Sequence, residues 1–146
     1  MAALVDTLAN RLSPDRLWGV APRSSHIPER AVARVAPLAA PHWVDDPARP
    51  RPIRLLDRPE PIEVTALLPD DPPLQFRWRG ALHRVRAAAG PERIAAEWWR
   101  RSAGLAGQSD LLRDYYRVED AAGGRFWVFR VGLDRAPRWF LHGLFG

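Results

Sequence analysis

Apolar and polar residues alternate with a period of two over much of the second half of the chain. Between residues 74 and 79, Leu74, Phe76 and Trp78 take every second position, which is the pattern of a strand with one buried face. The strands predicted in this way cover residues 62–68, 74–79, 81–88, 115–119, 125–131 and 139–144. Six strands joined by short links predict a small barrel or a strongly curled antiparallel sheet.

The strand predicted over residues 125–131 is apolar on both faces. Phe126 and Val128 fall on one face, and Trp127 and Phe129 fall on the other, so we expect this strand to be covered on both sides. The Ala-Ala-Gly-Gly sequence at 121–124 predicts a hairpin turn before it. The large rings of this region are Tyr115, Tyr116, Phe126, Trp127, Phe129, Trp139, Phe140 and Phe145. Each can bury on the order of 150–250 Å², so they predict the core of a small β-domain.

The first residues of the chain follow a helical period instead. Val5, Leu8 and Leu12 recur at the spacing of one helix face, and Pro14 ends the pattern. Residues 17–20 then read as a short strand. Because a helix of about ten residues is marginal alone in water, it must pack against something.

Prolines are concentrated in the middle of the chain, at positions 37, 41, 47, 50, 52, 59, 61, 69, 72 and 73. They favour extended backbone over sheet, apart from an edge strand that residues 53–56 could add. The sequence therefore predicts a mainly β member of the α+β class. It has a helix-strand segment at 1–22, a Pro-rich tether at 23–60 and an antiparallel β-domain at 61–146, in which 92–101 is the one candidate for a helical turn.

Composition narrows the function classes only a little. All 22 basic residues are Arg, a bias that a GC-rich genome produces by codon supply. The formal net charge of +5 is spread over the whole chain, which is a mild field and not a dense DNA-binding stripe. No cysteine is present to form a disulfide or a thiolate metal site, and neither a signal peptide nor an apolar membrane span is apparent. A cytoplasmic protein away from the membrane is expected.

No set of residues in the sequence assembles an active site. The histidines, at 26, 42, 83 and 142, lack metal-ligand spacing, and no Gly-rich phosphate loop or nucleophile motif occurs. The aspartate pairs at 45–46 and 70–71 lie in Pro-rich turns, where Asp bonds to the backbone, and they fit turns better than a metal site. His142 fits a hydrogen-bonded core histidine better than a general base. We therefore expect no catalytic residue, metal or cofactor.

Four arginines interleave with apolar residues on two neighbouring predicted strands: Arg77, Arg79, Arg84 and Arg86. Arginine beside rings is typical of surfaces that bind single-stranded nucleic acid, through phosphate contacts and stacking. Ordinary alternation explains the same pattern, with rings inward and arginines solvated. Both interpretations stay open, and the second is the simpler.

Three segments resemble one protein family. They are SHIPERAV at 25–32, GPERIAAEWWRR at 90–101 and RDYYRVEDAAGGRFWVFRVGLDRAPRWFLHGLFG at 113–146. Together they are similar to the C-terminal region of ImuB, a family of catalytically inactive homologues of Y-family DNA polymerases that serves damage-induced mutagenesis in bacteria. The resemblance spans nearly the whole chain, and the polymerase core is absent. The sequence does not tell whether the chain is a natural product or a piece of a longer protein.

The resemblance implies a partner for the first segment. ImuB proteins work with ImuA, a RecA-like protein, and RecA-type ATPases grip neighbours through a helix followed by one short strand. The residues expected to make this contact are Val5, Leu8 and Leu12 on the helix with Leu17, Trp18 and Val20 on the strand. The alternative is that the helix packs on the chain's own β-domain or on the absent polymerase core.

Two further features carry weaker indications. Gln108, Leu111 and Leu112 resemble the peptides by which ImuB binds the bacterial sliding clamp, although the terminal aromatic residue of that motif is missing. Trp98 and Trp99 belong to the EWWR sequence that recurs in the family, and they could serve either packing or binding.

The sequence therefore predicts a non-catalytic assembly module of a translesion-synthesis complex of the SOS response. The complex would also hold an error-prone replicative-type polymerase and the sliding clamp. The alternative is a module that binds single-stranded or primer-template DNA with the Arg-rich face of the β-domain. Salt distinguishes them, because phosphate contacts weaken steeply with salt and apolar contacts do not. A stand-alone enzyme is the least supported interpretation.

Overall fold

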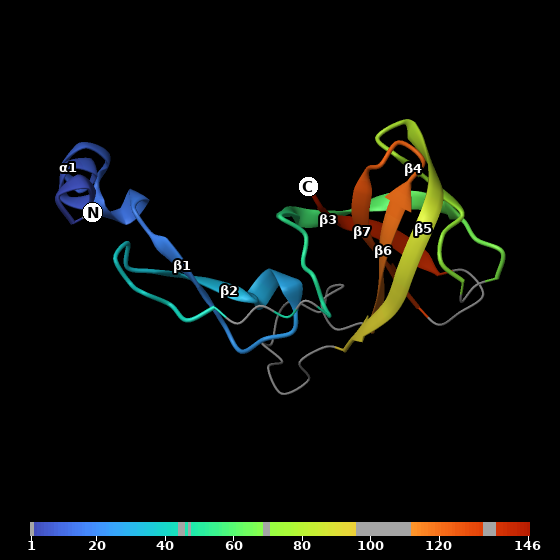
Figure 1. The fold of residues 1–146 in the computed structure, drawn as a ribbon, viewed down its shortest axis with the longest axis horizontal. Helices are drawn as coiled ribbons and strands as arrows, with labels where there is room; N and C mark the ends of the chain where they lie inside the picture. The colour runs from blue at the N-terminus through green and yellow to red at the C-terminus, as the bar shows by residue number, and fades with distance from the viewer. Residues whose placement is uncertain (1, 44–45, 47, 69–70, 96–111, 133–136) are drawn as a thin grey trace. The chain divides into compact units, whose positions relative to one another are not determined.

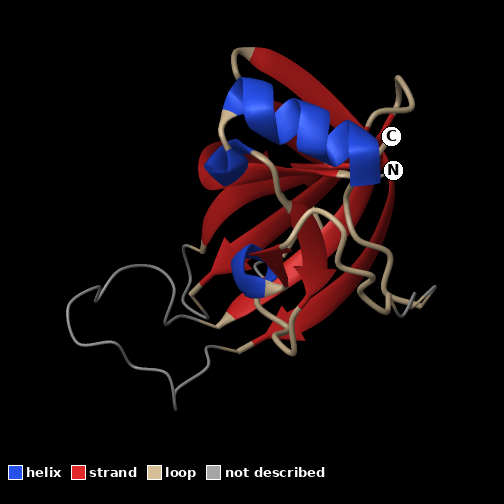
Figure 2. Cartoon of the chain, turned by 90° about the vertical axis from the view of Figure 1, so that its left-hand side faces the viewer, coloured by secondary structure: helices blue, strands red, loops and turns tan. Residues whose placement is uncertain are grey.

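The chain divides into an N-terminal helix-hairpin unit and a β-barrel unit. The computed structural model describes residues 2–43, 46, 48–68, 71–95, 112–132 and 137–146. The two compact units are Met1–Ala48 and Arg49–Gly146. Strands predominate in the described chain, and its α-helix lies near the N-terminus (Figure 1, Figure 2). The predicted mainly β member of the α+β class is confirmed.

The N-terminal unit contains one α-helix and one β-hairpin. Its elements are α1 (Ala2–Leu12), the 3-10 turn η1 (Pro14–Arg16), β1 (Gly19–Pro22), the 3-10 turn η2 (Pro28–Arg30) and β2 (Val32–Val35). The helix ends as predicted, because Ser13 takes a left-handed φ of 74° and Pro14 follows it. β1 and β2 pair antiparallel, with Val20 opposite Arg34. In Figure 1, α1 lies beyond the end of this hairpin.

The hairpin differs from the prediction in two ways. The strand expected at 17–20 begins two residues later, at Gly19, and β2 forms within the segment that was predicted as tether. Four residues of alternation at Val32–Val35 are too few to separate from extended loop by pattern alone. The partner strand β1 supplies the hydrogen bonds that make β2 a strand.

The second unit is a closed, six-stranded antiparallel barrel. Its strands are β3 (Arg54–Thr65), β4 (Gln75–Trp78), β5 (Ala81–Ile94), β6 (Arg113–Asp120), β7 (Arg125–Val131) and β8 (Arg138–Leu144). Each strand pairs with its neighbour in sequence, and β8 returns to pair with β3, with Leu144 opposite Arg54. The predicted meander and its hairpin between β6 and β7 are confirmed.

β3 and β5 extend furthest beyond the bounds that the sequence predicted. β3 begins at Arg54 and not at Ile62, so the edge strand expected at 53–56 is the first part of this strand. The pairing of β3 with β8 shifts register between Leu55 and Glu60, which accommodates Pro59 within the strand. β5 runs on to Ile94, so the expected helical turn at 92–101 is wrong for residues 92–94, which pair with β6. Residue 95 follows the strand without helical structure, and residues 96–101 lie outside the described residues.

The barrel interior is filled by buried side chains from five strands, and the partly buried Val85 of β5 packs against them. The buried cluster comprises Ile62, Phe76, Tyr116, Val118, Phe126, Val128, Trp139 and Leu141. Phe76 is completely buried, and its ring meets that of Phe126 edge to face at 5.3 Å between centroids. The interior is therefore a packed core and not a channel.

A second aromatic cluster lies on the opposite face of β6, β7 and β8. It comprises Ile94, Tyr115, Trp127, Phe129, Val131 and Phe140. Phe126 and Val128 belong to the first cluster while Trp127 and Phe129 belong to the second, so the expectation that β7 is covered on both sides is confirmed.

A short strap, residues 50–52, crosses part of this second cluster. Arg51 donates two hydrogen bonds to the carboxylate of Glu92, at 2.6 and 2.7 Å, and its guanidinium lies 5.0 Å from the ring centroid of Trp127. Pro52 packs against Gly143 so closely that no Cβ would fit there. The proline-rich approach to β3 thus forms part of the barrel's outer packing.

Candidate functional site

The helix α1 presents apolar side chains that the described chain leaves unburied. Val5 and Leu8 are half-buried, and Leu12 remains 46% exposed. No residue of α1 is fully buried by the described part of the chain. Leu4, which is not among the predicted contact residues, is 56% exposed. A helix with an open apolar stripe can bury this surface only by contact with another molecule or segment.

The β1–β2 hairpin adds an exposed apolar face. Trp18 and Val20 are exposed, and Leu17 is half-buried. The register places Pro22 opposite Val32, so the exposed Val32 continues the same face. This contribution of Val32 was not predicted, because β2 has too short a pattern to recognise in the sequence. The guanidinium of Arg34 lies 4.4 Å from the ring centroid of Trp18. Within the described chain, β1 pairs on one side only, so its other edge is open.

The four arginines of the predicted Arg-rich face differ in their ion-pair partners. Arg79 donates to Glu60 through Nε at 2.9 Å and a terminal nitrogen at 2.6 Å, and it lies 4.8 Å from the ring centroid of Trp78. Arg77 lies 3.8 Å from a carboxylate oxygen of Glu63. Hydrogen bonds from Arg79 and then Trp78 hold the pKa of Glu60 below its ordinary value. Two of the four charges therefore have carboxylate partners.

Arg84 and Arg86 differ from those two. Both are exposed on β5, and neither makes a side-chain hydrogen bond or ion pair with the described residues. They lie just before three consecutive alanines, Ala87, Ala88 and Ala89, whose small side chains leave the strand open to solvent. The part of the Arg-rich face that is free to bind an anion is therefore on β5.

A pocket on the barrel surface was not anticipated from the sequence. It has a volume of about 270 Å³ and is lined by Pro50, Ala87, Ala88, Ala89, Arg117, Val118, Glu119, Arg125 and Phe145. These residues come from β5, β6, β7, the strap and the segment after β8. No sequence motif links them, because the pairing of β5, β6 and β7 brings distant residues together beside the strap and Phe145.

An ionic cluster around a buried carboxylate lies at one end of the barrel. Asp114 accepts hydrogen bonds from Arg93 at 2.7 and 3.0 Å and from Arg130 at 3.0 and 3.3 Å. The hydrogen bond from Arg93, opposed by burial and supported by Arg130, holds the pKa of Asp114 below its ordinary value. Nearby, the Tyr115 hydroxyl lies 2.8 Å from Nδ1 of the fully buried His142. The expectation that His142 is a hydrogen-bonded core residue is confirmed.

A second polar pair lies beside the β6–β7 turn. Nδ1 of His83 is 2.8 Å from Oδ2 of Asp120, while Oδ1 of Asp120 accepts from the backbone amides of Ala122 and Gly124. Burial acts to raise the pKa of Asp120, but the hydrogen bonds from His83, Gly124 and Ala122 outweigh it and lower that pKa. Asp120 therefore stabilises the hairpin turn as an anion.

Acid is expected to destabilise the barrel through these carboxylates. The pKa values of Glu92, Asp114 and Asp120 are lower in the folded chain than their ordinary values of 4.5, 3.8 and 3.8. Their contribution is therefore fully present above those ordinary values and is lost as the pH falls through the lower folded values. Urea unfolding between neutral pH and the acid range should show a falling midpoint. A midpoint that stays constant on acidification would contradict this assignment.

Several predicted features fall outside the described residues. They are Gln108 and Leu111 of the suggested clamp-binding peptide, and Trp98 and Trp99. Leu112 is described and is half-buried just before β6. Among the described residues there is no group of three or more His, Cys, Asp or Glu side chains that could hold a metal ion. No helix in the described ranges is both long and apolar enough to cross a bilayer.

Comparisons with known proteins locate the chain in a family. Residues 43–144 match the family described as "Domain of unknown function (DUF6504)". The whole chain is 55% identical, over an alignment of 155 residues, to "Protein ImuB" of Caulobacter vibrioides, in strain NA1000 / CB15N and in strain ATCC 19089 / CIP 103742 / CB 15. It spans 33% of the length of each, and no solved structure matches it. The chain therefore belongs to the DUF6504 family and corresponds to a C-terminal region of ImuB.

Proposed function

We propose that the chain is a non-catalytic assembly module whose N-terminal unit docks a RecA-like protein of the ImuA type. The single observation that carries this is the open apolar surface of that unit. Leu4 and Leu12 of α1, and Trp18, Val20 and Val32 of the hairpin, are all exposed. A short amphipathic helix and an open strand edge are two recurrent ways of binding a partner protein.

The similarity to ImuB supports this proposal and supplies its setting. By that resemblance the chain takes part in damage-induced mutagenesis in the bacterial cytoplasm, within a translesion-synthesis complex. An error-prone replicative-type polymerase and the sliding clamp would enter the same complex, and the chemistry on DNA would be theirs. The module itself would then hold the RecA-like protein close to the polymerase and the clamp.

The energetics of the proposed contact are favourable. Burying apolar side chains contributes about 25 cal/mol per Å², so a helix stripe and a strand together can supply enough for micromolar binding after the costs of association. Because this contact is apolar, added salt should change it little. Arg34, which lies over Trp18, holds that indole ring in place at the docking surface.

Charged substitutions on the helix face test the docking function. A Leu8→Asp, Leu12→Asp double variant should bind an ImuA-type RecA-like protein at least about 100-fold more weakly, since each buried leucine contributes about 1.5–3 kcal/mol. Isothermal titration calorimetry at low and high salt measures both the affinity and its salt dependence.

The matched control is Thr7→Asp, Asn10→Asp. It adds the same charge to exposed polar positions of α1 and should bind like the unmodified chain. Equal weakening by both double variants would indicate a loss of helix or a general effect of charge, and would count against the docking face. If the unmodified chain does not bind the RecA-like protein, the proposed partner is wrong.

A second candidate function is binding of single-stranded or primer-template DNA by the barrel. The observation that favours it is the pair of exposed arginines on β5, Arg84 and Arg86, which the described residues leave without ion-pair partners. Arg77 and Arg79 contribute less to such a surface, because each already has a carboxylate partner, Glu63 at 3.8 Å and Glu60 at 2.6 Å. Binding of this kind would weaken steeply with salt.

A further inference from the structure

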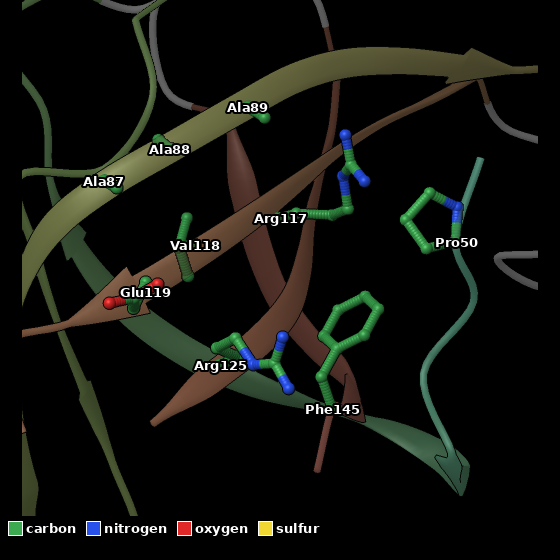
Figure 3. Close-up of a pocket in the computed structure, with 9 residues that line it drawn as sticks. All are labelled: Pro50, Ala87, Ala88, Ala89, Arg117, Val118, Glu119, Arg125 and Phe145. Carbon is green, nitrogen blue, oxygen red and sulfur yellow. The ribbon is translucent and has the colours of Figure 1, made fainter. Parts of the chain in front are cut away.

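The pocket beside the three alanines of β5 has the shape and chemistry of an anion-binding site. In Figure 3, Arg117 and Arg125 project from neighbouring strands, and the ring of Phe145 stands beside them with Pro50 on its far side. Ala87, Ala88 and Ala89 border the opposite side along β5. The pocket thus combines two guanidinium groups, one ring and a low border of small side chains.

The barrel register explains why these groups meet. Ala87 pairs with Glu119, which pairs with Arg125, and Ala89 pairs with Arg117 on the next outward row. Residues paired across adjacent strands share a face, and outward rows repeat every second residue. Arg117 and Arg125 therefore lie on adjacent outward rows of β6 and β7.

Arg117 brings a partly buried positive charge to the pocket. It is half-buried, yet it makes neither a hydrogen bond nor an ion pair with the described residues. Its charge acts at a distance on Glu92, whose carboxylate is already bound by both terminal nitrogens of Arg51. Burying part of a guanidinium without an acceptor has a cost, which an anion in the pocket would remove.

The remaining polar groups leave the pocket positive. Arg125 donates to the backbone carbonyl oxygen of Gly146 and retains other N–H groups for a ligand. Glu119 is the acidic residue among those that line the pocket. Two guanidinium groups against one carboxylate favour an anionic ligand.

We propose that this pocket binds a backbone phosphate of single-stranded nucleic acid, with Phe145 stacking on an adjacent base. This inference rests on the second candidate function and assigns it a site. Guanidinium groups recognise phosphate oxygens through paired N–H donors, and rings beside a basic groove stack bases with little regard to sequence.

The arrangement of the neighbouring arginines favours a nucleic acid over an acidic peptide. Arg84 and Arg86 precede the alanines on β5, so exposed positive charge continues along that strand to the pocket. A chain with a negative charge on every unit can contact all of these groups in succession. An acidic peptide with one or two carboxylates would use the pocket alone and leave Arg84 and Arg86 without a role.

The test uses the full chain and a fluorescently labelled oligothymidylate, with anisotropy measured over a series of salt concentrations. Arg117→Ala should weaken binding about tenfold. It should also reduce the slope of log K against log salt by about 0.7, the value for one phosphate contact on a single strand. The matched control is Arg138→Ala, which removes the same charge from an exposed position at the other end of β8 and should leave affinity unchanged.

The other outcomes separate this site from the function on which it rests. If the unmodified chain does not bind the oligonucleotide at low salt, both the second candidate function and the proposed phosphate site are wrong. Binding that Arg84→Ala and Arg86→Ala weaken, but Arg117→Ala and Arg125→Ala do not, would keep the function and overturn the pocket. Tighter binding of oligoglutamate than of oligothymidylate at matched salt, lost on Arg117→Ala, would assign the pocket to an acidic peptide instead. If Arg117→Ala fails to fold, the exposed Arg125→Ala gives the same comparison.

Discussion

Replacing Asp114 with Asn is expected to lower the barrel's free energy of unfolding by about 3 kcal/mol. The carboxylate is only 2% exposed and accepts hydrogen bonds from both Arg93 and Arg130. Arg130 is itself 4% exposed, so the substitution takes an anion away from a cation that remains buried. Removing one partner of a buried ion pair costs far more than removing an exposed one.

Urea unfolding followed by far-ultraviolet circular dichroism measures this loss. Asp57→Asn is the matched control, because Asp57 is exposed on β3, and it should change stability by less than about 0.5 kcal/mol. The Asp114 variant should also lose part of the acid sensitivity of the barrel, since one of its low-pKa carboxylates is gone. Similar stabilities for the two variants would show that the cluster contributes no more than a surface pair.

Trp127→Ala is expected to cost about 4 kcal/mol, within the range for removing a buried Trp side chain. The indole is 1% exposed although it points to the outer face of β7. Its ring stacks on Tyr115 at 4.1 Å between centroids, and Arg51 of the strap lies over it. The substitution therefore opens a cavity in the second aromatic cluster and also removes what the strap packs against.

Trp18→Ala is the control of equal size. Trp18 lies in the N-terminal unit and is 47% exposed, so its loss should leave barrel unfolding nearly unchanged while it weakens docking of the RecA-like partner. A cost below about 1 kcal/mol for Trp127→Ala would mean that the outer cluster is only loosely packed.

The sequence was informative wherever a pattern was long and local. Residues 125–131 carry large apolar side chains on both faces, and this alone predicted two clusters on either side of β7. The Ala-Ala-Gly-Gly turn likewise set the register of the hairpin between β6 and β7. Both features depend on residues that are neighbours in the chain.

Features that depend on distant residues could not be predicted. A strand that contains Pro59 reads as a tether until its pairing with β8 is known. Asp114 looks like any charged residue in an alternating strand, and its burial depends on Arg93 and Arg130 from two other strands. Arg117 belongs to no recognisable motif. Its place in a pocket becomes apparent only once β5, the strap and Phe145 are positioned around it. A binding surface that is formed by the register of paired strands cannot be recognised from a local sequence pattern.

The pairing of the first and last barrel strands also determines how the barrel should respond to force. Because Arg54 at the start of β3 lies opposite Leu144 at the end of β8, the two attachment points of the barrel are side by side. A pull applied there would separate the β3–β8 ladder one hydrogen bond at a time, as a zipper opens, and would not load all of them in shear. Forced unfolding is governed by the unfolding rate and not by equilibrium stability. The barrel should therefore open at this seam under low tension, however well its two aromatic clusters are packed.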